Sequence, residues 1–101
     1  MIFRTLNRLS ILLLFLVPLS TPAHAETREV LLAAYSVPKE VYEKRLIPAF
    51  VQQWKQRTGE TLHIRSSFAA SGAQARAIAG GLDADIAALS LESDLQQLVQ
   101  A

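Results

Sequence analysis

Apolar and polar residues alternate along residues 26–101 in a pattern that predicts strands and helices in turn. Glu29 to Ser36 is a nearly continuous apolar run, typical of a strand that is covered on both faces of a parallel sheet. From Lys39 to Thr58 the apolar residues recur every three or four positions, which predicts an amphipathic helix. Pro48 interrupts this segment, so we expect two helices or one kinked helix, ended by Gly59.

The remainder of the chain continues the strand-then-helix order. Thr61 to Ser67 alternates between apolar and polar residues and predicts a strand. Ser71 is expected to be the N-cap of a helix that Gly80 and Gly81 end. Ala84 to Leu91 predicts a short apolar strand, and Glu92 to Ala101 a last helix. This order predicts an α/β fold, a parallel sheet with covering helices joined by right-handed crossovers.

The first 25 residues have the composition of a secretory signal peptide. Arg4 and Arg8 precede an apolar run from Ile11 to Val17, and small residues end the segment at Ala25. This order predicts export and cleavage after Ala25. A membrane anchor is the alternative, but a span needs about 20 apolar residues and this run is shorter.

Composition narrows the classes of function. Removing Arg4 and Arg8 leaves eight basic residues against nine acidic ones, so the formal charge of residues 26–101 is −1, whereas that of the whole chain is +1. Such a balance argues against a nucleic-acid partner. The chain has no cysteine, and His63 is the one histidine after Ala25, which excludes a disulfide scaffold and argues against a metal site. We expect no cofactor. A chain this short without such staples is expected to be marginally stable on its own.

Three loops of the predicted sheet qualify as a ligand-binding edge, because ligands of open α/β sheets bind at the carboxyl ends of the strands. They are residues 35–39, 67–72 and 89–94. The second loop offers the Ser71 hydroxyl, the glycine Gly72 and the free N–H groups of a helix N-terminus, a combination suited to an anion. A serine at this position also serves simply as a helix cap, and the residues alone leave both readings open.

Catalysis is not predicted. A serine nucleophile needs a base within hydrogen-bond reach, and His63 lies mid-strand with an outward orientation expected. Asp83 and Asp85 are expected to close a turn rather than to form a catalytic pair. Arg76 is expected to be solvated or paired with Asp83.

Three blocks of the chain carry a family resemblance: "LLAAYS", "VYEKRLIPAFVQQWKQRTGE" and "ASGAQARAIAGGLDADIAAL", in that order. Together they resemble the periplasmic sulfate- and thiosulfate-binding proteins of ABC importers. The family's third block commonly reads Gly-Gly-Ser-Gly-x-Gln, then a helix, then Gly-Leu-x-Ala-Asp. The residues of this chain that match it are Ser71, Gly72, Gln74, Gly81, Leu82, Ala84 and Asp85.

The resemblance implies a type II periplasmic-binding fold, with residues 26–101 as the N-terminal part of the first of two α/β lobes. It implies a periplasmic protein that delivers sulfate or thiosulfate to the membrane subunits of an importer. The dehydrated oxyanion would be held by backbone N–H groups, serine hydroxyls and helix N-termini. Matched residue by residue, Ser71 falls on the anion-contacting serine, with the backbones of Gly72 and Ser36 beside it.

Two departures from the family pattern create further expectations. Ala69 and Ala70 stand where the family has two glycines, so the loop would be strained if either position needed a positive φ. The resemblance reaches only the opening strand–helix units of one lobe, and we therefore expect weak or absent sulfate binding and exposed apolar surface. The alternatives are a binding protein for another oxyanion, such as molybdate, and a small exported interaction protein that pairs its exposed sheet with a partner.

Overall fold

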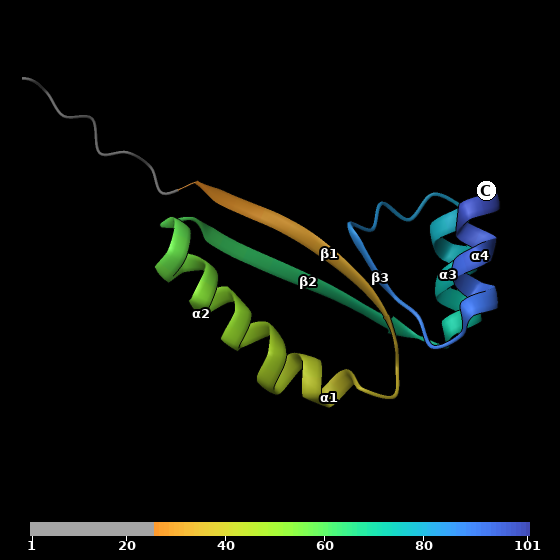
Figure 1. Cartoon of the computed structure of the whole chain (residues 1–101), viewed down its shortest axis with the longest axis horizontal. Coiled ribbons are helices and arrows are strands. Elements are labelled where there is room, and N and C mark those ends of the chain that lie inside the picture. The colour runs from red at the N-terminus through yellow and green to blue at the C-terminus, as the bar shows by residue number, and fades with distance from the viewer. Residues whose placement is uncertain (1–25) are drawn as a thin grey trace, which may run out of the picture.

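The computed structural model describes residues 26–101, so the predicted signal peptide lies outside the described residues. A three-stranded parallel sheet with the strand order β2-β1-β3 forms the centre of the molecule (Figure 1). The strands are β1 (Thr27–Tyr35), β2 (Thr61–Ala69) and β3 (Ile86–Ala88). The predicted α/β fold with a parallel sheet is therefore confirmed.

The central strand β1 is paired on both sides. Its register with β2 runs from Thr27 opposite Thr61 to Tyr35 opposite Ala69. Its register with β3 is shorter and begins with Leu32 opposite Ile86. The central position fits the apolar sequence of β1, in which Leu32, Ala33 and Ala34 are buried.

The segment between β1 and β2 is one helical run with an irregular turn. It consists of α1 (Lys39–Val41), the π-helical turn η1 (Tyr42–Leu46) and α2 (Ile47–Thr58). Pro48 occupies the first turn of α2 and has no N–H to donate to the preceding turn, which accounts for the wider π turn before it. Gly59 ends α2 with a φ of 74°, as predicted.

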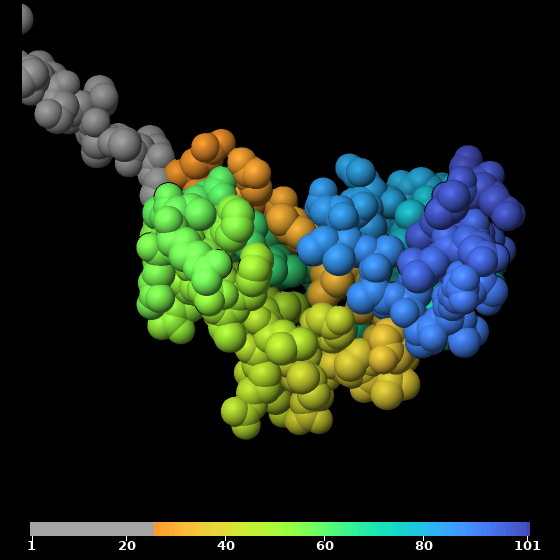
Figure 2. All heavy atoms as spheres, in the orientation of Figure 1, coloured from red at the N-terminus to blue at the C-terminus, as the bar shows by residue number. Residues whose placement is uncertain are grey.

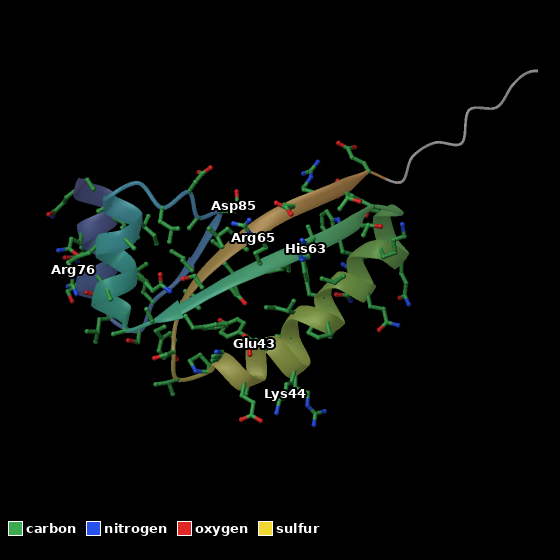
Figure 3. All side chains as sticks on the ribbon, turned by 180° about the vertical axis from the view of Figure 1, so that it is seen from behind. Glu43, Lys44, His63, Arg65, Arg76 and Asp85 are labelled. Atoms are coloured by element: carbon green, nitrogen blue, oxygen red, sulfur yellow. The ribbon has the colours of Figure 1, made fainter. Side chains whose placement is uncertain are left out.

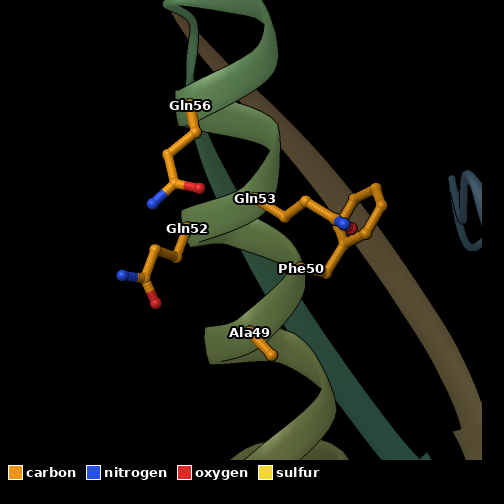
Figure 4. Close-up of a pocket in the computed structure, with 5 residues that line it drawn as sticks. All are labelled: Ala49, Phe50, Gln52, Gln53 and Gln56. Atoms are coloured by element: carbon orange, nitrogen blue, oxygen red, sulfur yellow. The ribbon is translucent and has the colours of Figure 1, made fainter.

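The outer side of α2 is polar. Gln52 and Gln56 are exposed and point away from the strands, whereas Phe50 lies on the side of the helix nearer to them (Figure 4). Trp54 donates a 2.7 Å hydrogen bond from Nε1 to Glu60 while its ring lies 5.9 Å from that of Phe50. The amphipathic pattern thus places the aromatic residues of α2 towards the sheet.

The other two helices, α3 (Ser71–Ala79) and α4 (Glu92–Gln100), lie side by side near the carboxyl ends of the strands (Figure 1). The fully buried apolar set in the described residues is small: Leu32, Ala33, Ala34, Leu62 and Ala75. Three of these five side chains are alanine, so the elements approach closely but bury little apolar area. No helix within residues 26–101 is long and apolar enough to cross a membrane.

Candidate anion-binding site

The carboxyl ends of the three strands lie at one edge of the sheet, and a serine follows each of them closely. Tyr35 and Ala69 are register partners, which places the loop beginning at Ser36 beside the start of α3. The third loop joins them through a hydrogen bond of 3.1 Å from the Ser90 N–H to the Ser71 Oγ. All three loops named from the sequence therefore lie at the edge where ligands of such sheets bind.

Ser71 is buried, with 8% of its surface exposed, but it is not the helix N-cap. The helix α3 begins at Ser71, its N-cap is Ala70, and no side chain in the described part of the chain caps it. The prediction of a capping serine is wrong because the hydroxyl is oriented across to the third loop instead, where it accepts the hydrogen bond from Ser90. The interpretation of Ser71 as a helix cap alone is therefore wrong as well.

The alanines that replace the family's two glycines are not strained. Ala70 has φ −59° and ψ 144°, and no residue other than glycine has a positive φ in the described part of the chain. The loop therefore takes a path that any L-residue can adopt. The possible strain raised by the sequence does not occur.

The first turn of α3 leaves several donors free. Within residues 26–101 the N–H groups of Ser71, Gly72 and Ala73 donate no hydrogen bond, whereas the N–H of Gln74 donates to the Ala70 carbonyl at 2.9 Å. The Ser36 N–H is likewise free there, although the Ser36 carbonyl accepts a bond of 3.2 Å from Lys39. Free N–H groups and the positive end of the helix dipole together favour an anion.

Gly72 lies at the contact between α3 and α4. A Cβ at this position would stand 3.4 Å from Arg76 Nη1 and 3.7 Å from Asp94 Oδ1. The missing side chain therefore makes room for these two groups. Asp94 Oδ2 is buried and has no hydrogen-bond partner among residues 26–101. An acceptor carboxylate thus lies next to Gly72.

Gln74 has a role at this edge that its sequence context did not predict. Only 1% of its surface is exposed. Its Nε2 lies 3.0 Å from the Ala34 carbonyl, 2.8 Å from the Ser67 carbonyl and 3.3 Å from the Ser67 Oγ, and it donates to these groups. This amide fixes the first turn of α3 to the last residues of both β1 and β2. Its only signal in the sequence is its place in the Ser-Gly-x-Gln block.

Within residues 26–101, the other polar residues singled out from the sequence contribute no hydrogen bond to the loops at this edge. His63 is exposed on β2 and its Nδ1 is 3.3 Å from Glu29 Oε1 (Figure 3). Asp85 accepts a hydrogen bond of 2.8 Å from the Leu31 N–H and so caps the start of β3 against β1, in line with the structural role expected of it. Arg76 is exposed on α3, and among the described residues no ion pair joins it to Asp83.

No protein-family model matches the chain. The sulfate-binding protein of Synechococcus elongatus is 45% identical over 73 residues, which are 72% of this chain and 21% of that protein. The sulfate-binding protein of Escherichia coli is 33% identical over 95 residues, which are 94% of this chain and 28% of that protein. The thiosulfate-binding protein of Escherichia coli is 40% identical over 76 residues, 74% of this chain and 22% of that protein.

The chain is related to the sulfate- and thiosulfate-binding proteins. The family resemblance inferred from the three sequence blocks is thereby confirmed. The chain spans between 20% and 28% of the length of the sulfate-binding relatives that it matches. Each of the relatives described above is named for the anion that it binds and not for a reaction.

Proposed function

We propose that this chain contributes one side of an oxyanion-binding site in a solute-binding protein that serves sulfate or thiosulfate import. The observation that carries the proposal is the free first turn of α3, where three N–H groups and a buried serine hydroxyl meet the carboxyl edge of the sheet. The names of the relatives supply the anion. In this proposal residues 26–101 form the first part of an α/β lobe, and residues 1–25 direct export to the periplasm.

Each proposed contact has a distinct role. The Ser71 hydroxyl uses a lone pair to accept from the Ser90 N–H, which leaves its proton for an anion oxygen. The backbone N–H groups of Gly72 and Ser36 add two further donors. Because sulfate carries no proton at neutral pH, it accepts from every side, and a site built of donors fits it.

The Asp94 carboxylate limits the anions that this site would favour. A negative group near the first turn of α3 repels a dianion and offers an acceptor to a protonated one. Arg76 lies beside the same glycine and offsets part of this charge. We keep sulfate and thiosulfate as the proposed ligands on the strength of the relatives, with another oxyanion such as molybdate as the alternative.

Titration calorimetry with sodium sulfate tests the proposal on the chain and on Ser71→Ala. Loss of one hydrogen bond to a charged ligand costs about 1.5–3 kcal/mol, which is a decrease in affinity of about 10-fold to 150-fold. Ser66→Ala, at an exposed serine of β2, is the matched control and is expected to leave the affinity unchanged. Equal affinities of the chain and of Ser71→Ala would contradict the assignment of this serine.

A chain that covers so little of its relatives is expected to bind sulfate weakly by itself. Micromolar affinity of the isolated chain would show that the described residues suffice for the site. No heat with sulfate or thiosulfate, together with tight binding of molybdate, would change the proposed ligand but not the proposed donors.

A further inference from the structure

Arg76 belongs to the last turn of α3, but its guanidinium lies beside the first turn. Its Nη1 is 3.4 Å from the point where a Cβ of Gly72 would stand. Side chains on a helix lean towards its N-terminus and meet the residue four positions earlier, and the missing side chain of Gly72 leaves room there. A cation thus lies next to the free N–H groups that the proposed anion site uses.

The helices α3 and α4 form one block at the carboxyl end of the sheet. Figure 2 shows the teal and blue atoms of these helices packed together, with the yellow atoms of the first loop against the block. The first turn of α3 lies where the three loops meet, since the Ser90 N–H donates to the Ser71 Oγ there. Charged groups on α3 and α4 therefore act on this turn at short range.

The position of Arg76 is unfavourable unless a negative charge lies nearby. The first turn is the positive end of the helix dipole and carries free N–H groups, and both disfavour a cation. Within residues 26–101 the guanidinium forms no ion pair. An anion bound at this turn would supply the missing negative charge.

Asp94 places a negative charge at the same turn. Its Oδ1 is 3.7 Å from the Cβ position of Gly72, and its Oδ2 is buried without a hydrogen-bond partner in the described part of the chain. Asp94 lies in the first turn of α4, where the dipole of that helix stabilises a carboxylate. The same carboxylate repels an anion at α3, so a positive charge is needed to balance it.

We propose that Arg76 is a specificity-determining residue of the anion site: its charge cancels that of Asp94 and lets the first turn of α3 bind a doubly charged oxyanion. This inference rests on the proposed function, because it concerns the same turn. The energy between two charges is proportional to each of them. Removing the charge of Arg76 therefore weakens a dianion by the square of the factor by which it weakens a monoanion of the same shape. Because Arg76 is exposed and partly screened by solvent, we expect factors of about threefold for a monoanion and about ninefold for a dianion.

Sulfate and perchlorate are suitable probes, since both are tetrahedral oxyanions without a proton at neutral pH, and sulfate carries two charges where perchlorate carries one. The chain is expressed from its full 101-residue sequence with an isotope label. NMR titration at low ionic strength then follows the amides of Ser71, Gly72 and Ala73, a readout that also works where the affinity is weak. Each variant is compared with the wild type for the same anion, so the different hydration of the two anions cancels.

Arg76→Gln is expected to lower the affinity for sulfate about ninefold and that for perchlorate about threefold. Arg76→Lys keeps the charge and is expected to retain most of both affinities. Arg57→Gln, the same loss of charge at an exposed residue in the last turn of α2, is the matched control and is expected to change neither. Combining Arg76→Gln with Asp94→Asn is expected to restore the wild-type ratio of the two affinities, because both charges are then removed. Circular dichroism shows whether each variant retains the fold.

Equal factors for the two anions, or no loss with either, would overturn the role of Arg76 while the amide shifts still support the proposed function. A loss in Arg76→Lys as large as in Arg76→Gln would overturn it as well, because a specific hydrogen bond and not a charge would then be responsible. If neither anion shifts the amides of the first turn, the proposed function is rejected and this inference is rejected with it.

Discussion

Gln74→Met is expected to destabilise the chain by about 1–3 kcal/mol, because it removes a buried donor while leaving its acceptors in place. Methionine has nearly the length and volume of glutamine, so the change tests the hydrogen bonds more than the packing. The Ala34 and Ser67 carbonyls, 3.0 and 2.8 Å from the Gln74 amide nitrogen, lose their side-chain donor. Leaving a buried acceptor unsatisfied costs more than the bond itself contributes.

Urea unfolding measures this loss. The fluorescence of Trp54 reports on the transition, since the chain has one tryptophan. A small domain has a free energy of unfolding of about 5 kcal/mol, so a loss of 2 kcal/mol lowers the urea midpoint by roughly two fifths. Gln52→Met, at an exposed glutamine of α2, is the matched control and is expected to leave the midpoint unchanged. A change below 0.5 kcal/mol in Gln74→Met, about the limit of a neutral surface substitution, would refute the reasoning.

Gln74→Glu replaces the amide donor by a carboxyl group, which donates a hydrogen bond only while it is protonated. Above the unfolded-state pKa of about 4.3 an ionised carboxylate would face two carbonyl oxygens, so burial would raise its folded-state pKa. The variant should thus be closest to the wild type in stability at pH 4 and fall further below it as the pH rises towards 7. A stability difference independent of pH would show that the side chain has turned out to solvent.

Two further substitutions test single local features by urea unfolding. Gly59→Ala is expected to lower the free energy of unfolding by about 1 kcal/mol, because a φ of 74° strains an L-residue. No atom of the described residues lies within 4 Å of the new Cβ, so the loss would come from the backbone and not from a clash. An unchanged midpoint would show that the helix end has moved to another conformation. Asp85→Ala removes the acceptor of the Leu31 N–H at an exposed site and is expected to cost about 1 kcal/mol, whereas Asp85→Asn keeps an acceptor and should cost less. Equal losses in the two Asp85 variants would exclude this hydrogen bond as the cause.

The order and type of the main elements could be predicted from the sequence because hydrophobic periodicity and glycine ends are local signals. The π form of the turn η1 could not, because Pro48 signals an interruption of the helix but not the shape that the interruption takes. The strand β3 is shorter than the apolar run from Ala84 to Leu91, since only Ile86 to Ala88 pair with β1. An apolar run in the sequence therefore does not give the length over which a strand pairs.

The three loops that the sequence names do lie together at the carboxyl edge, because the parallel topology alone brings them there. Its internal contacts were not predictable. The hydrogen bond from Ser90 to Ser71 joins residues 19 apart, and that from Gln74 to Ala34 joins residues 40 apart. Such contacts depend on how closely the helix approaches the sheet, which a single sequence does not specify. The sequence therefore predicts Ser71 as the N-cap of α3, whereas the N-cap in the structure is Ala70.

The alanine-rich core and the geometry of the candidate site have a common cause. Ala33 and Ala75 are completely buried, and small side chains at these two positions let α3 approach β1 closely enough for the Gln74 amide to reach the Ala34 carbonyl. Larger side chains would bury more apolar area but would move the first turn of α3, and with it the free N–H groups, away from the sheet edge. The close approach thus leaves the described residues short of buried area.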